Sequence, residues 1–116
     1  GDVYKRQVEA GDERATMVLD VYNYRIKKYI GAYAAAMGGC DILVWTGGVG
    51  ENQWATRRVV CENMEYMGMK IDVEKNEGMR GEEMVISTPD SKVTIIVVPT
   101  DEEYMIAADT MDILGK

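Results

Sequence analysis

An uninterrupted apolar run that ends in glycines constrains the fold more than any other feature of this sequence. The run from Asp41 to Thr46 contains Ile-Leu-Val-Trp, and residues 47–52 continue Gly-Gly-Val-Gly-Glu-Asn. A continuously apolar run of this length is typical of a strand buried on both faces. Glycines without Cβ atoms let the turn after it approach a ligand closely. A buried strand, a glycine turn and a helix start in succession are how α/β proteins build anion and nucleotide sites.

The glycine spacing does not by itself identify the site. No Lys-Ser or Lys-Thr pair follows the glycines, as a P-loop requires, and Gln53 stands where the third glycine of a dinucleotide-binding fingerprint belongs. Taken alone, the pattern fits a tight strand-to-helix connection as well as it fits a nucleotide site.

Apolar residues with helical spacing predict a long helix from Asp12 to Met37. Asp12 is suited to cap its first turn, and the glycines at 38–39 to end it. We expect the tyrosines of this helix to pack in a core or an interface, and Asn23 to lie on its polar side. The apolar positions are Ala15, Val18, Leu19, Tyr22, Ile26, Tyr29, Ile30, Tyr33 and Met37.

The second half of the sequence predicts a helix, a hairpin and a further helix. The helix after the glycines is expected over Gln53–Met67, with Arg57 and Arg58 facing outward; together with Arg80 they are expected to be solvated or in salt bridges. Residues 84–87 and 92–98 predict hairpin strands around a turn that contains proline, with a short strand at 70–72 before them. The last helix runs from Thr100 towards residue 113.

Helix, strand, helix, hairpin and helix in this order indicate an α/β layer. The two apolar strands, residues 42–46 and 94–98, are most economically parallel neighbours joined by a crossover helix. Ligands of such sheets bind beyond the carboxyl ends of the strands. We therefore expect the glycine turn after Thr46 and the acidic turn after Val98 to share one edge of the sheet.

Three separated segments carry a resemblance to a known family. Residues 46–52 read Thr-Gly-Gly-Val-Gly-Glu-Asn, residues 98–103 read Val-Pro-Thr-Asp-Glu-Glu, and residues 11–33 open with Gly-Asp-Glu-Arg-Ala. In order and spacing they resemble the C-terminal part of the acetate kinases. The resemblance implies a partial actin-like, ribonuclease H-like lobe, with residues 8–116 as the C-terminal part of the second lobe. Residues 1–7 match nothing in the family pattern and are predicted to be a non-native or disordered leader.

The same resemblance implies the ligands and the residues that hold them. ATP or ADP would be bound by the glycine segment, and Mg²⁺ would lie near Glu102, directly or through water. Glu102 also has a purely structural explanation as a first-turn carboxylate, and Glu103 is expected to cap the helix together with Thr100. The family motif has Asn where this chain has Asp101. The residues implied for the nucleotide are Gly48, Val49, Gly50, Glu51 and Asn52.

The activity that the resemblance implies is the conversion of ATP and acetate to ADP and acetyl phosphate. The family's catalytic residues come from earlier segments, so none is assigned here and the isolated chain is expected to be inactive. A kinase of propionate or butyrate is an alternative, and a non-catalytic nucleotide-binding module is another. A homodimer is expected for the full-length protein.

Composition narrows the range of partners. Twenty Asp and Glu residues against 13 Lys and Arg disfavour nucleic acids and anionic membranes, which bind basic surfaces. No run has the length of a membrane span and no signal peptide is recognisable, so the chain is expected to be cytoplasmic. The absence of histidine excludes a Ser-His-Asp triad within this sequence. Cys40 and Cys61 have no metal-binding spacing and are expected to be reduced, packed thiols.

Overall fold

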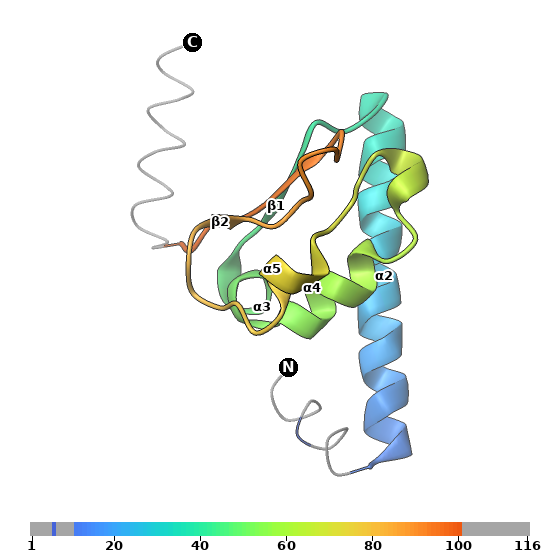
Figure 1. Ribbon diagram of the computed structural model, residues 1–116. Coiled ribbons are helices and arrows are strands. Elements are labelled where there is room, and N and C mark those ends of the chain that lie inside the picture. The colour runs from blue at the N-terminus through green and yellow to red at the C-terminus, as the bar shows by residue number, and fades with distance from the viewer. Residues whose placement is uncertain (1–5, 7–10, 101–116) are drawn as a thin grey trace.

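The computed structural model describes residue 6 and residues 11–100, which form an α/β arrangement with a mixed three-stranded sheet (Figure 1). A long helix precedes the first strand, short helices follow it, and a hairpin ends the described part. The elements are α2 (Glu13–Met37), β1 (Ile42–Trp45), α3 (Gly47–Asn52), α4 (Trp54–Cys61), the 3₁₀ helix η1 (Glu65–Met67), α5 (Val73–Asn76), β2 (Met84–Val85) and β3 (Thr94–Val97).

Both ends of α2 lie where the sequence predicts them. The Asp12 carboxylate accepts a hydrogen bond from the Ala15 amide at 3.1 Å, which satisfies one of the free N–H groups of the first turn. Gly38 has a left-handed φ of 79°, and the Gly39 amide donates to the Ala34 carbonyl at 2.8 Å. A left-handed glycine after the last turn is the usual way to end a helix.

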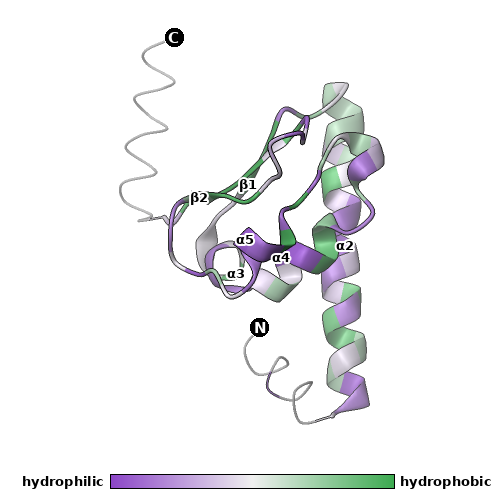
Figure 2. Ribbon diagram, in the orientation of Figure 1, coloured by the Kyte–Doolittle hydropathy of each residue, from purple (hydrophilic) through white to green (hydrophobic). Residues whose placement is uncertain are grey.

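The buried side of α2 matches the predicted one at Ala15, Ile26 and Ile30 and departs from it at Asn23 and Ala34. Asn23 and Ala34 are buried, and Ile26 and Ile30 pack against the core, so the contact side follows positions 23, 26, 30 and 34. The placement of Asn23 on the polar side is therefore wrong. Apolar residues occur around much of this helix, as the mixed colours of Figure 2 show, and packing against α4 selects the side that is buried.

The tyrosines of α2 do not enter the core of the described structure. Tyr24, Tyr29 and Tyr33 are all more than half exposed, and the rings of Tyr29 and Tyr33 stack with centroids 6.4 Å apart. Packing in an interface, the other expectation for these rings, stays a prediction. Within the part of the chain that the structure describes, no helix is both long and apolar enough to cross a membrane.

The sheet has the order β1-β3-β2 and confirms the predicted strand pairing. β1 and β3 are parallel, with Ile42 opposite Thr94 and Trp45 opposite Val97. β2 runs antiparallel to β3 and forms the predicted hairpin with it. The predicted short strand at residues 70–72 is reduced to isolated bridges, Met69 to Val93 and Ile71 to Ser87.

β1 is buried on one face only, so the expectation of burial on both faces is wrong. Trp45 is buried and Leu43 packs against the core. Ile42 and Val44, which point to the opposite face, are 60% and 49% exposed. The helices pack on the Trp45 side of this edge strand. On the other side, the described residues leave Ile42 and Val44 about half exposed.

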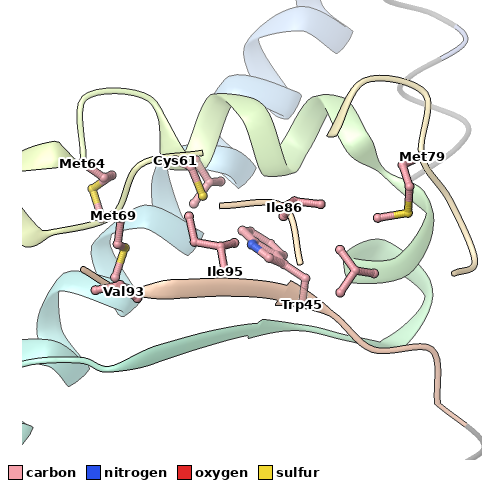
Figure 3. Close-up of a cluster of buried hydrophobic side chains, with 10 residues drawn as sticks. Trp45, Cys61, Met64, Met69, Met79, Ile86, Val93 and Ile95 are labelled. Carbon is pink, nitrogen blue, oxygen red and sulfur yellow. The ribbon is translucent and has the colours of Figure 1, made fainter. Parts of the chain in front are cut away.

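The core lies between α4 and the sheet (Figure 3). Burial raises the pKa of the Cys61 thiol to about 12, so this thiol stays protonated and unreactive at neutral pH. Both cysteines are free, as expected, with Cys61 buried and Cys40 partly buried. The core residues are Trp45, Val60, Cys61, Met64, Met69, Met79, Ile86, Val93, Ile95 and Val97.

Candidate nucleotide site

The glycine segment after β1 forms a short helix, not the predicted turn. Thr46 is extended, with φ −150° and ψ 172°, and Gly47 adopts a φ of 73° that side chains rarely tolerate. The chain then coils through α3. The predicted single helix over residues 53–67 is correct only in part, because α4 ends at Cys61 and the short η1 follows it. Gln53, between α3 and α4, has a non-helical conformation of φ −99° and ψ 73°.

Gly48 and Gly50 have different environments on α3. Gly50 is buried, and a methyl group at this position would lie 3.0 Å from the Trp45 carbonyl carbon and 3.3 Å from its Cα. Gly48 is exposed, and a methyl group there would meet nothing within 4 Å. Gly50 therefore allows α3 to pack against the end of β1, whereas Gly48 leaves an open surface.

Val49 and Asn52 complete the predicted set on α3. Both side chains are partly buried. Asn52 is the last residue of α3, and Gln53, not Asn52, is the N-cap residue of α4. Among the residues described, the Asn52 side chain makes no hydrogen bond that would prevent it from binding a ligand.

The carboxyl ends of β1 and β3 meet at one edge, as predicted. The Thr46 hydroxyl donates to the Val98 carbonyl at 2.8 Å, and the Val98 amide donates to the Trp45 carbonyl at 2.9 Å. Oε2 of Glu51 accepts hydrogen bonds from the Thr100 amide at 3.3 Å and from the Thr100 hydroxyl at 3.2 Å. The acidic residues that follow, including Glu102 and Glu103, lie outside the described residues.

Arg57 is fully buried, so its predicted outward position is wrong. Its Nε donates to Asn76 Oδ1 at 2.8 Å, and its Nη1 donates to the carbonyls of Gly50 and Glu51 at 2.8 and 3.1 Å. Nη2 donates to the Met79 carbonyl. Burial lowers the pKa of the guanidinium, which nevertheless stays charged because arginine is so basic.

The buried guanidinium explains why the chain can leave the helical path at Gln53. Carbonyls at a helix end need partners, and Arg57 supplies donors to two of them, Gly50 and Glu51. A signal in the sequence pointed to this burial, since Arg57 precedes Val60, Cys61 and Met64 by three, four and seven residues. That spacing places it on the apolar side of α4. Arg58 is partly buried, and Arg80 is exposed as expected.

The described residues do not form a metal centre. Within residue 6 and residues 11–100, no group of three or more Cys, Asp or Glu side chains could hold an ion. The open surface at Gly48 fits a ligand that lies against the backbone. α3 is also bracketed by both tryptophans of the chain, since Trp45 ends β1 and Trp54 begins α4.

A short glycine-rich helix at the carboxyl end of a parallel strand is typical of α/β proteins, which bind ligands at this edge of the sheet. The sequence model described as the acetokinase family matches residues 2–108. The chain belongs to this family of kinases.

Individual relatives agree with this assignment. An acetate kinase of Parabacteroides distasonis is 90% identical over 109 residues, which cover 94% of this chain and 27% of the relative. The crystal structure of Porphyromonas gingivalis acetate kinase matches with a TM-score of 0.87 and 67% identity, over 96% of this chain and 28% of that one. A propionate kinase from Francisella tularensis matches with a TM-score of 0.76 and 30% identity, over 91% and 27%. The chain thus spans about 27% of the length of the curated relatives.

Proposed function

We propose that the full-length protein containing this chain is an acetate kinase, which converts ATP and acetate to ADP and acetyl phosphate. Family membership and the printed names of the relatives support a kinase. The observation that carries the role of this chain is the open backbone surface at Gly48, on a helix that begins where β1 ends. Phosphoryl transfer depends mainly on positioning of the nucleotide and compensation of its charge.

In this proposal α3 presents the nucleotide-binding surface. The adenosine part of ATP lies against Gly48, where a side chain would intrude, and Val49 forms an apolar wall beside it. Asn52 hydrogen-bonds the nucleotide from the other end of α3. Gly50 acts indirectly, because its lack of a side chain lets α3 pack close to β1. The Glu51 carboxylate is hydrogen-bonded to Thr100, so Glu51 is proposed to support this segment without contacting the nucleotide through its side chain.

Mg²⁺ is proposed to bind near Glu102, two residues after Thr100. When bound, the ion would offset the negative charge of the phosphates. Carboxylate oxygens suit it as ligands. The residues that hold the carboxylate substrate and the transferring phosphoryl group are proposed to come from other segments of the protein, so this chain alone is inactive.

The wider setting follows from the same family assignment. We propose that residues 8–116 are the C-terminal part of the second, actin-like lobe, and that the full-length protein is a cytoplasmic homodimer. Its partners are ATP and acetate; nucleic acids and membranes are not among them. The family match begins at residue 2, which speaks against the expectation that residues 1–7 are foreign to the family pattern.

A kinase for propionate is the second candidate, because a solved propionate kinase matches most of this chain. A butyrate kinase would share the same nucleotide side. The selecting experiment is to assay the full-length protein for phosphoryl transfer from ATP to acetate, propionate and butyrate. We expect the highest kcat/KM with acetate. A higher kcat/KM with propionate or butyrate would identify that acid as the preferred substrate. Transfer to none of the three would favour a non-catalytic nucleotide-binding module.

Replacing Gly48 with alanine in the full-length protein is expected to weaken ATP and ADP binding by about tenfold or slightly more, or 1 to 2 kcal/mol. The added methyl group would occupy space proposed for adenosine. KM for acetate and the melting temperature should stay close to wild type, since the methyl group meets no protein atom within 4 Å and Gly48 has no left-handed φ. Equal losses for both substrates with a lower melting temperature would contradict the nucleotide contact.

A further inference from the structure

The side chain of Glu51 is already engaged within the protein. Its Oε2 accepts both the Thr100 amide, at 3.3 Å, and the Thr100 hydroxyl, at 3.2 Å. The two residues are 49 positions apart in the sequence, so this contact joins α3 to the chain leaving β3. In residues 11–100, no lysine or arginine forms an ion pair with this carboxylate. Its hydrogen-bonding partner within the described structure is Thr100.

The main chain of Glu51 is held as firmly as its side chain. Its carbonyl accepts from Arg57 Nη1 at 3.1 Å and from the Gly81 amide at 3.1 Å. Arg57 is itself fully buried and is fixed further by Asn76 and by the carbonyls of Gly50 and Met79. The backbone of Glu51 is thus already fixed by a buried network. Its carboxylate can therefore hold a second segment in a defined position at a small further cost in conformational entropy.

We propose that Glu51 is a positioning residue that fixes Thr100 against α3, and through it sets the start of the acidic segment relative to the nucleotide. Glu51 then acts without touching the reacting atoms. The inference rests on the proposed function, in which the nucleotide lies on α3 and Mg²⁺ binds two residues beyond Thr100. Loss of this contact would leave the nucleotide surface intact and disturb the approach of the metal-binding segment.

The experiment uses the full-length protein with Glu51→Ala, Glu51→Gln and Thr100→Val. Hydrogen exchange at the Thr100 amide measures the contact directly. We expect Glu51→Ala to speed exchange at Thr100 about tenfold or more, because the Thr100 amide loses the carboxylate to which it donates. Gln keeps a neutral acceptor and should fall between alanine and wild type. Glu82→Ala, which removes an exposed carboxylate from a loop, should leave exchange at Thr100 unchanged.

Steady-state kinetics measures the consequence. Glu51→Ala should raise the Mg²⁺ concentration for half-maximal rate several-fold, while the Kd for ADP without Mg²⁺ stays within about twofold of wild type. Combining Glu51→Ala with Thr100→Val should add little to the effect of Glu51→Ala alone, since Glu51→Ala already removes the acceptor of the hydroxyl that Thr100→Val deletes.

Two outcomes overturn the inference. Unchanged exchange at Thr100 with weaker binding of Mg²⁺-free ADP would make Glu51 a nucleotide contact. Faster exchange at Thr100 with an unchanged Mg²⁺ requirement would reduce the contact to a purely structural one. A wild-type protein that transfers phosphoryl groups to no carboxylate would instead overturn the proposed function, and exchange at Thr100 would still decide whether Glu51 holds this residue.

Discussion

Replacing Arg57 with methionine in the full-length protein is expected to lower the free energy of unfolding by about 3 to 5 kcal/mol. Methionine fills much of the same space but donates no hydrogen bonds. The carbonyls of Gly50 and Met79 and the side-chain Oδ1 of Asn76 would lose their Arg57 donor in a buried region, and each unpaired polar group costs about 1 to 3 kcal/mol. The Glu51 carbonyl would keep the Gly81 amide as its donor. Urea-induced unfolding followed by circular dichroism measures the change.

Two further substitutions at arginines make this result specific. Arg57→Lys should also be strongly destabilising, because an ammonium group cannot reach acceptors spread around a planar guanidinium. Arg80→Met, at an exposed position, should change stability by less than about 0.5 kcal/mol. Similar losses for Arg57→Met and Arg80→Met would show that the buried hydrogen bonds add nothing to stability.

Replacing Gly50 with alanine is expected to cost about 1 to 3 kcal/mol of stability through overpacking. The new methyl group would approach the Trp45 backbone to 3.0 Å, and a backbone cannot rotate away as a flexible side chain can. α3 would have to move away from β1. The same unfolding experiment measures the loss.

Gly48→Ala is the matched control, since it adds the same methyl group to the same helix at a position with no atom within 4 Å. It should leave stability unchanged or raise it slightly, because alanine favours helix over glycine. Comparable destabilisation by both substitutions would mean that helix conformation, and not the contact with Trp45, decides the requirement for glycine.

Local sequence patterns predict the parts of this fold that local interactions form. Asp12 and Gly38 mark the ends of α2 because capping involves residues three or four positions apart. The hairpin follows from a proline turn between two short strand patterns. The parallel pairing of β1 with β3 joins distant residues, and it is predictable because both are apolar runs and a crossover between parallel neighbours is the simplest connection. The meeting of the two strand ends at one edge follows in turn from parallel pairing.

The remainder depends on contacts between distant residues. The charge of Arg57 predicts a surface position, because its buried partners at Asn76 and Met79 lie 19 and 22 residues further along the chain and are not visible in the local pattern. The glycine segment predicts a turn because glycine is a poor helix former, yet tertiary packing coils it into α3. The sequence pattern also does not distinguish Gly48 from Gly50. The two differ only in the structure, where Gly50 packs against the Trp45 backbone and Gly48 has no atom close to it.

The position of α3 between the two tryptophans makes this region optically visible. Trp45 is 7% exposed and lies in the core, on the N-terminal side of α3, while Trp54, on its C-terminal side, is partly buried. With no other tryptophan in these 116 residues, tryptophan emission from the chain comes from the two residues that flank α3. A shift of α3 would change the polarity around these indoles, so the wavelength of maximum emission provides a label-free probe of this helix.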